Sequence, residues 1–349
     1  LLNVCNVFLG RFTGGLATVT VVLCMFFAAV SGSGPATVAA IGSMVIPTML
    51  QKGYSKSFTL ALIATAGSIG VIIPPSIPMV VYGVSTSTSI SSMFMAGFLP
   101  GLMIGGSLIL VSYIYCKKHG WKGDDYKYSA KEKLAAIWDA KWALINPVII
   151  LGGIYAGIFT PTEAAAVAAV YAFICGVFIY KELDIKQLFG TLGNACNTTG
   201  TTMVIIGCAT AFTKILTIEK IPDAITNGIL NFSDNMIVIL LLINLLLLVV
   251  GCFMDTTPAM MVLSPILLPI ALQFGIDPIH FGLIMVVNLA IGFITPPLGI
   301  NLFVAARVGS SKLETVCSGI IKFIIVMLVD LMLITFIPEI SMTLPKLLM

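Results

Sequence analysis

Two kinds of apolar run alternate along the chain, and they predict two kinds of membrane helix. Runs such as 93–116 and 320–337 are uninterrupted, and about 20 apolar residues suffice to cross the hydrocarbon core of a bilayer. Other runs are shorter and are broken by clusters of Gly, Ser and Pro. A membrane tolerates bare backbone of that kind only where it lines a cavity or is buried in protein. The pattern therefore predicts an all-α polytopic membrane protein with irregular backbone at membrane depth.

Two of the interrupted segments predict re-entrant hairpins, in which two half-length helices meet at a tip. The first hairpin covers about 14–50, and its tip is Ser-Gly-Ser-Gly-Pro at 31–35. The second hairpin covers about 236–272, and its tip is Met-Asp-Thr-Thr-Pro at 254–258. Each hairpin is followed by a discontinuous helix with paired prolines in its middle. The first broken helix covers about 57–84 with Pro74-Pro75, and the second covers about 279–306 with Pro296-Pro297.

The two broken regions form an internal repeat with an offset of 222 residues. Nine positions in 47–75 are identical to their mates in 269–297. The identities include Gly, Gln and the double proline in register, which a shared apolar bias does not explain. Each copy therefore predicts the same unit, a hairpin followed by a helix broken at Pro-Pro.

Lys and Arg orient these segments, because cytoplasmic loops carry an excess of both. Segment 117–142 holds seven Lys and all three Trp, and it predicts a cytoplasmic amphipathic segment in the membrane interface. Counting crossings from there places most other Lys and Arg on the same side. The first hairpin then opens inward and the second opens outward, so the repeat is inverted. Inverted repeats with discontinuous helices at the midplane are typical of secondary transporters.

The remaining segments predict a framework around the repeats. Runs 143–159 and 164–180 pair as a helical hairpin, in which Thr162 caps the second helix and Glu163 lies in its first turn for a structural reason. Run 201–218 predicts another span. The predicted division is a transport domain of 1–92 and 236–308, scaffold helices in 93–235, and a C-terminal scaffold helix in 309–349.

Composition excludes the soluble classes of protein. The 349 residues are 58% hydrophobic and 9% charged, whereas a soluble chain is about 25% charged. Soluble enzymes and nucleic-acid-binding proteins are therefore excluded, and the bilayer is the expected environment. The eight cysteines include no CxxC pair, which favours buried free thiols over metal ligands or disulfides.

Six motifs of the chain are shared with one transporter family. Two lie in the first repeat, one lies between the repeats, and three lie in the second repeat. They are Ser31-Gly-Ser-Gly-Pro35, Ile72-Ile-Pro-Pro-Ser-Ile-Pro-Met79, Gly157-Ile-Phe-Thr-Pro-Thr-Glu-Ala-Ala-Ala166, Phe253-Met-Asp-Thr-Thr-Pro258, Gly275-Ile-Asp-Pro-Ile-His-Phe-Gly282 and Ile294-Thr-Pro-Pro-Leu-Gly-Ile-Asn-Leu-Phe303. Together they resemble the large membrane subunit (DctM-like or SiaM-like) of the TRAP (tripartite ATP-independent periplasmic) transporters, from about residue 1 to 345.

This resemblance implies a sodium-driven importer of organic acids in the bacterial inner membrane, with C4-dicarboxylates or sialic acid as usual substrates. It implies two partners, a periplasmic substrate-binding protein and a small four-helix membrane subunit. It also implies an elevator fold, in which a transport domain with both hairpins slides against a scaffold. Subunits of this family normally have further helices before this point, so an N-terminal part is expected to be missing or split off.

The first sodium site is expected at the tip of the first hairpin and the break of the first broken helix. Na⁺ is a hard cation that prefers oxygen ligands, and both hydroxyl groups and free carbonyl groups are available there. The expected ligands are Ser31, Ser33, Gly34, Gly70, Ile73 and Pro74. The other reading of this tip is a flexible turn.

The second sodium site is expected at the repeat mates of these positions. Its expected ligands are Asp255, Thr256, Thr257, Gly292, Thr295 and Pro296. A carboxylate at membrane depth is costly and should be paired or face water. Asp255 therefore has two compatible interpretations, a cation or substrate ligand and a cap for the second helix of the hairpin.

Four residues are candidates for contact with the organic acid, namely Ser76, Asn301, Arg307 and Asp255. An Arg fork suits a carboxylate, but Arg307 is equally typical of a positive-inside anchor. His280 is interpreted as a helix-boundary residue.

Two rival functions differ from a binding-protein-dependent importer. A stand-alone sodium–carboxylate symporter would share the hairpins and need no binding protein. An intramembrane hydrolase would need a Ser–His pair, two membrane aspartates or a zinc motif. The only histidines are His119 and His280, and no HExxH motif is present, so the chain is not expected to be an enzyme.

Overall fold

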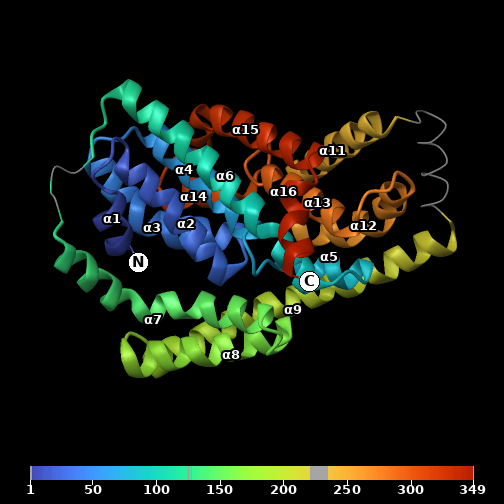
Figure 1. The fold of residues 1–349 in the computed structure, drawn as a ribbon, viewed down its shortest axis with the longest axis horizontal. Helices are drawn as coiled ribbons and strands as arrows, with labels where there is room; N and C mark the ends of the chain where they lie inside the picture. Colours follow the sequence, from blue (N-terminus) through green and yellow to red (C-terminus); the bar gives the residue numbers. More distant parts are fainter. Residues whose placement is uncertain (1, 124–125, 127, 221–234, 349) are drawn as a thin grey trace.

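The protein is helical throughout the part of the chain that the structure describes. The computed structural model describes residues 2–123, 126, 128–220 and 235–348, and their regular elements are all helices (Figure 1). Seven of these helices are long and apolar enough to cross a membrane, judged by length and composition. The shorter apolar helices gather around two interruptions of the backbone, as the sequence pattern predicts.

A compact body contains both repeats. Its first half consists of α1 (Leu2–Leu9), α2 (Gly15–Ser31), α3 (Gly34–Gln51), α4 (Lys56–Ser68), the 3₁₀ turn η1 (Ile69–Val71), α5 (Ile77–Thr86) and α6 (Ile90–His119). Its second half consists of α11 (Met236–Phe253), α12 (Thr256–Gln273), α13 (Pro278–Gly292), α14 (Ile300–Val308), α15 (Leu313–Phe336) and α16 (Glu339–Leu348).

The two repeats interlock within this body. Helix α3 of the first hairpin packs on α14, the distal half of the second broken helix. In the same way, α12 of the second hairpin packs on α5, the distal half of the first broken helix. The Tyr82 hydroxyl donates to the Pro278 carbonyl oxygen at 2.7 Å, and the Ser85 and Ser264 hydroxyl oxygens lie 2.9 Å apart. Each hairpin is therefore held by the other repeat as well as by its own.

Helices α6 and α15 pack closely against the repeats. Helix α15 packs along α4, where the hydroxyl oxygens of Ser57 and Ser318 lie 2.8 Å apart. Helix α6 packs against α2, α15 and α16, and the Ser107 hydroxyl donates to Asp330 of α15 at 2.5 Å. A buried polar chain adds to this packing, because the Asn288 amide donates to Asn244 Oδ1 at 2.7 Å and the Asn244 amide donates to Thr335 Oγ1 of α15 at 3.2 Å.

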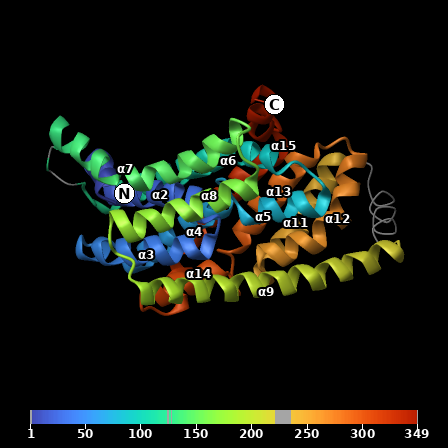
Figure 2. The same cartoon turned by 90° about the horizontal axis from the view of Figure 1, so that it is seen from below.

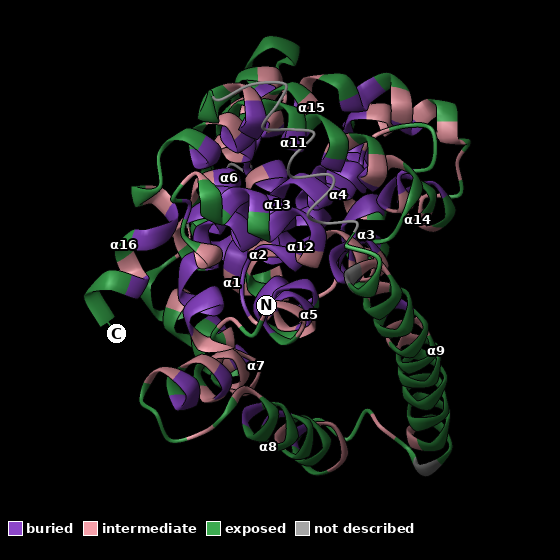
Figure 3. Ribbon diagram, turned by 90° about the vertical axis from the view of Figure 1, so that its right-hand side faces the viewer, coloured by how far each residue is buried: buried purple, intermediate pink, exposed green. Residues whose placement is uncertain are grey.

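Helices α7 (Ala130–Tyr155), α8 (Pro161–Ile174) and α9 (Ile185–Ile218) form an arm outside the body, and a π-helical turn, η2 (Cys175–Ile179), follows α8. Figure 3 shows α8 and α9 mostly exposed, whereas the helices of the body are mostly buried. Helix α9 runs along the underside of the body (Figure 2) and packs on α12. Helix α8 packs chiefly on α7.

The arm differs from the sequence prediction in three boundaries. Helix α7 runs without interruption through Trp142, so the interfacial segment predicted to end there and the following span are one helix. Helix α9 begins at Ile185 rather than near residue 201. Thr160, not Thr162, is the N-cap of α8, because its hydroxyl accepts a hydrogen bond from the Glu163 backbone amide at 3.3 Å.

The structural interpretation of Glu163 is confirmed at the same place. Its carboxylate accepts hydrogen bonds from the backbone amide and the hydroxyl of Thr160, both at 2.8 Å. This reciprocal pairing is a capping box, which satisfies amides that the first turn of a helix leaves free. The motif between the repeats therefore builds the α7–α8 turn.

Candidate functional site: two hairpin tips beside two helix breaks

The tip of the first hairpin lies directly against the first helix break. Gly32 and Ser33 join α2 to α3, and the Gly32 carbonyl oxygen accepts a hydrogen bond from the Ile77 amide at 3.3 Å. Gly32 has a φ of +61°, and a Cβ atom there would lie 2.7 Å from the Pro75 carbonyl oxygen. Both the backbone conformation and the close approach require glycine at this position.

Oxygen atoms gather at this tip. The hydroxyl oxygens of Ser31 and Thr37 lie 3.0 Å apart, and the Thr37 hydroxyl donates to the Ser33 carbonyl oxygen at 2.8 Å. A Cβ atom at Gly70 would lie 2.6 Å from that carbonyl oxygen and 2.5 Å from Thr37 Oγ1. Helix α3 and the η1 turn therefore approach as closely as their backbones allow, and glycine at position 70 makes this possible.

The structure brings three of the six residues expected at the first sodium site into this cluster, namely Ser31, Ser33 and Gly70. Gly34 lies at the same tip, but a Cβ atom there would point at the other repeat, 3.1 Å from the Phe293 ring. The Ile73 side chain packs on Gly101 of α6, and Pro74 lies in the break between η1 and α5. Sequence reasoning missed Thr37. The available signal was its spacing, because it lies one helical turn after Ser33 on α3.

The tip of the second hairpin has a different construction. Asp255 is the N-cap of α12, and its carboxylate accepts a hydrogen bond from the Thr256 amide at 2.7 Å. The interpretation of Asp255 as a helix cap is therefore confirmed. Its side chain is exposed, unlike Ser33 at the repeat-related position, which is partly buried.

The second set of expected sodium ligands is spread out rather than clustered. Gly292 lies against Gly251 of α11, where a Cβ atom would meet the backbone at 2.4 Å. Thr295 lies in the break after α13, and its hydroxyl donates to the Ile291 carbonyl oxygen of that helix at 2.8 Å. Among the described residues, no hydrogen bond joins Asp255 to Gly292, Thr295 or Pro296. A cavity of about 250 Å³ lies at this tip, between residues 251–254 and residues 298–300 and 303.

The four expected substrate contacts lie in different surroundings. Ser76 is buried as the N-cap of α5, where its hydroxyl donates to the Val71 carbonyl oxygen at 2.6 Å. Asn301 is buried between α14 and α4, and its amide donates to the Ala64 carbonyl oxygen at 3.0 Å and to Ser68 Oγ at 3.1 Å. Asp255 is exposed at the second tip.

Arg307 lies away from the first hairpin tip. It is exposed in the last turn of α14, close to the first turn of α4, where Lys56 Nζ donates to the Ser310 carbonyl oxygen at 3.1 Å. The first hairpin tip lies at the other end of α4. With a rise of about 1.5 Å per residue, the 13 residues of α4 separate its two ends by about 18 Å. The structure therefore does not bring Arg307 to the oxygen cluster at the first tip.

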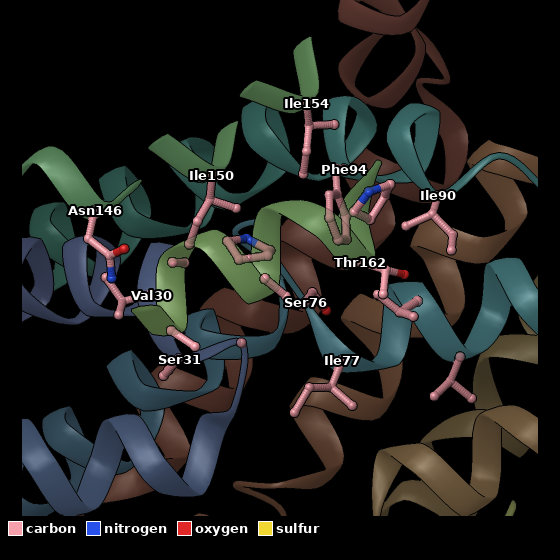
Figure 4. Close-up of a pocket in the computed structure, with 18 of the residues that line it drawn as sticks. Val30, Ser31, Ser76, Ile77, Ile90, Phe94, Asn146, Ile150, Ile154 and Thr162 are labelled. Atoms are coloured by element: carbon pink, nitrogen blue, oxygen red, sulfur yellow. The ribbon is translucent and has the colours of Figure 1, made fainter. Parts of the chain in front are cut away.

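A larger cavity of about 640 Å³ opens beside the first hairpin tip, between the body and the arm (Figure 4). Its body side includes Val30, Ser31 and Gly32 of the tip and residues 75–77 of the break. Its arm side is formed by α7, α8 and α9, and alanines of α8 line most of one wall. The cluster of oxygen atoms thus borders a space large enough for a small organic molecule.

These features define the class of the protein as a polytopic helical membrane protein with two broken helices and a cavity between a compact body and a helical arm. The family model for the tripartite ATP-independent periplasmic transporter, DctM component, matches residues 1–340. The chain belongs to this family. It is thus a multi-pass TRAP permease of the bacterial inner membrane and not an enzyme, as its motifs predict.

Curated relatives agree with this assignment. The chain is 51% identical to the isethionate TRAP transporter permease protein DctMQ of Oleidesulfovibrio alaskensis, over 98% of this chain and 54% of that protein. It is 42% identical to the C4-dicarboxylate TRAP transporter large permease protein DctM of Pseudomonas aeruginosa, over 99% and 81%. It is 37% identical to the sialic acid TRAP transporter large permease protein SiaM of Vibrio cholerae, over 99% and 80%.

Proposed function

We propose that this protein is the permease subunit of a sodium-coupled importer of small organic anions. The observation that carries the proposal is the cluster of oxygen atoms where the first hairpin tip meets the first helix break, at the edge of a cavity. Hydroxyl and carbonyl oxygens suit a hard monovalent cation. A cation bound there would bring a positive charge beside an anion in the cavity. The names of the relatives support organic anions as the cargo.

The proposed first sodium site uses the oxygens of Ser31, Ser33 and Thr37, together with backbone carbonyl groups around Gly70, Ile73 and Pro74. Gly34 is proposed to keep the tip in position as the first residue of α3. The proposed second site uses Asp255, Thr256 and Thr257 with Gly292, Thr295 and Pro296. The exposed tip of the second hairpin would have to move toward its break to complete that site. The two sites are therefore proposed to differ in affinity.

The transport motion is proposed to be an elevator movement of the whole body against the arm α7–α9. Helices α6 and α15 pack on the hairpin-bearing repeats through α2 and α4 and are about half buried there, whereas α8 and α9 are mostly exposed, which supports the movement of α6 and α15 with those repeats. This division assigns 93–116 and 309–349 to the transport domain, whereas the sequence pattern placed both in the scaffold. The inverted orientation of the two repeats is part of the same proposal.

Two protein partners are proposed. A periplasmic binding protein would deliver the anion, in keeping with the family description. A small four-helix membrane subunit would complete the scaffold, either as a separate chain or as a fused segment. The exposed apolar faces of α8 and α9 support a partner helix or lipid at the arm.

Uptake into proteoliposomes tests this function. The complete membrane complex would be reconstituted and supplied with labelled isethionate, succinate or sialic acid, with and without an inward Na⁺ gradient and the cognate binding protein. We expect uptake of at least one of these anions, and only when the Na⁺ gradient and the binding protein are both present. Sodium-driven uptake without the binding protein would instead establish the stand-alone symporter. Uptake that ignores the sodium gradient would contradict the proposal.

A further inference from the structure

Asn301 connects the second helix break to the residues that precede the first one. It is the second residue of α14, and it is completely buried. Its backbone amide donates to the Phe293 carbonyl oxygen at 3.0 Å, at the start of the second break. Its side-chain amide crosses to the first repeat, where it donates to the Ala64 carbonyl oxygen at 3.0 Å and to Ser68 Oγ at 3.1 Å. This residue therefore forms a bridge between the two repeats.

The bridge ends beside the first hairpin tip. Ser68 is the last residue of α4 and directly precedes the η1 turn. In that turn, Gly70 lies against the Ser33 carbonyl oxygen. A Cβ atom at Gly34 of the tip would lie 3.4 Å from the side-chain nitrogen of Asn301. Asn301 is thus a neighbour of both the tip and the break that form the proposed first sodium site.

The bridge is present in one half of the repeat only. At the repeat offset of 222, Asn301 corresponds to Met79 and Ser68 corresponds to Ala290. Neither Met79 nor Ala290 has a side chain that donates a hydrogen bond. The bridge therefore connects the first tip to the second break, and the equivalent positions cannot connect the second tip to the first break in this way.

Packing alone does not explain an asparagine at this position. Asn301 Oδ1 is buried and has no hydrogen-bond partner among the described residues. A buried acceptor without a donor lowers stability. An apolar side chain of similar size, such as the Met79 side chain at the repeat mate, avoids this cost. The polar bridge is therefore retained for something other than stability.

We propose that Asn301 is a positioning residue that couples the two sodium sites, an inference that rests on the proposed function. A cation that fixes the first tip against the first break also fixes Ser68. The bridge passes this restraint to the N-terminus of α14, which directly follows the second break at 293–299. That break carries Thr295 and Pro296 of the proposed second site. The first Na⁺ thus positions ligands for the second, which binds more tightly as a result.

Equilibrium binding of radiolabelled Na⁺ to the purified membrane complex tests this coupling without an organic anion and without transport. The wild-type complex is expected to bind Na⁺ in two steps, first at the oxygen cluster and then at the second site. Asn301→Leu has nearly the same size but cannot donate to Ala64 and Ser68. We expect it to leave the first dissociation constant unchanged and to raise the second about five-fold or more, as for a typical coupling between sites.

Thermal unfolding separates this coupling role from a structural one. Asn301→Leu removes the unpartnered oxygen together with the bridge, so its unfolding temperature is expected to stay close to that of the wild type. Ser68→Ala removes one acceptor of the bridge and keeps the other. It should also raise the second dissociation constant, by a smaller factor, and should have no further effect when it is combined with Asn301→Leu.

Asn288→Leu is the matched control. Asn288 is also completely buried, and its Oδ1 also has no hydrogen-bond partner among the described residues. Its amide donates to Asn244 of α11, so this contact lies within the second repeat. The substitution therefore removes the same kind of group without touching the bridge, and both dissociation constants should keep their wild-type values.

Four results would overturn the inference. They are a single bound Na⁺ in the wild-type complex, an unchanged second dissociation constant in Asn301→Leu, a first constant that rises in that variant, and an equal effect of Asn288→Leu. The third result would make Asn301 part of the first site itself, and the fourth would point to general packing. Sodium-dependent uptake would still stand in each case. A complex that binds no Na⁺ and imports anions without it would contradict the proposed function, and the inference with it.

Discussion

Asp255 combines two roles that one pair of substitutions separates. Asp255→Asn keeps a good N-cap but removes the charge, whereas Asp255→Ala removes both. If the carboxylate serves the second sodium site, Asp255→Asn should raise the Na⁺ concentration for half-maximal uptake about ten-fold while leaving stability within about 0.5 kcal/mol. Asp255→Ala should also lose about 1 kcal/mol of stability. Sodium titration of uptake and thermal unfolding measure the two effects. If Asp255→Asn showed the same sodium titration as the wild type, helix capping would be the only role left for Asp255.

Thr37 tests the first sodium site in the same way. Thr37→Val removes the hydroxyl that bridges Ser31 and Ser33 and keeps the shape of the side chain. We expect a sodium requirement raised about ten-fold, at a cost in stability of about 1 kcal/mol for the lost hydrogen bond. Thr65→Val is the control, because Thr65 is equally buried and its hydroxyl bonds only within α4. If both variants showed the same sodium titration as the wild type, Thr37 would not be a ligand.

The sequence predicted the kind of residue at the sites better than the contacts between residues. The sequence singled out Ser31, Ser33 and Gly70, which the structure brings together, because hydroxyls and glycine beside Pro-Pro are unusual in an apolar run. Thr37 was missed because the tip motif ends at Pro35. Thr37 lies beyond it on α3, whose sequence is that of an ordinary apolar helix. Arg307 was expected from its charge, but which end of α14 meets the tip depends on tertiary packing.

The contact between α11 and α13 depends on two facing glycines. Gly292→Ala places a Cβ atom 2.4 Å from the Gly251 backbone, so the two helices must separate. Overpacking of this kind costs about 1–3 kcal/mol, and it should also impair uptake because the separation occurs next to the break. Gly207→Ala on α9 is the control, because a Cβ atom there meets nothing within 4 Å. It should be neutral or slightly stabilising. Thermal unfolding of both variants measures the difference, and equal stability would contradict the tight contact.

At the scale of the helix, hydropathy located the breaks but not every boundary. The Gly, Ser and Pro clusters mark the ends of α2, α3, α11 and α12 within a few residues. In contrast, α7 combines a charged half and an apolar half in one helix, because nothing between Trp138 and Pro147 stops helical hydrogen bonding. A change of composition is not a helix end unless a capping or breaking residue accompanies it. Thr160 provides such a cap with Glu163, and this explains why α8 begins where it does.

The division into body and arm predicts which crosslinks stop transport. Val80 of α5 and Ala169 of α8 line the same cavity from opposite sides. A bifunctional thiol reagent that joins Val80→Cys to Ala169→Cys should abolish uptake, and reduction should restore it. A disulfide between Ser57→Cys and Ser318→Cys lies within the body and should leave uptake nearly unchanged. Both pairs would be made with the exposed Cys196 and Cys208 replaced by serine. If the link within the body also stopped uptake, α15 would not move with α4.

The arrangement of the whole molecule was the least accessible from the sequence. The repeat, and the inversion that we propose for it, rest on identities and charges, which are properties of the chain itself. The close packing of α6 and α15 on the repeats depends instead on which apolar faces meet, and apolar faces of membrane helices look alike in sequence. The predicted scaffold therefore included two helices, α6 and α15, that pack on the repeats.

Helix α9 has a length that matters for the surrounding lipid. Its 34 residues extend about 51 Å, whereas the hydrocarbon core of a bilayer is about 30 Å thick. Such an excess is accommodated by steep tilt, by projection into the headgroups or by local thickening of the membrane. Because α9 flanks the body on the underside seen in Figure 2 and packs on α12, a change of its tilt displaces the surface along which the second hairpin lies. We therefore expect the acyl chain length of the host membrane to affect transport, through the inclination of this single helix.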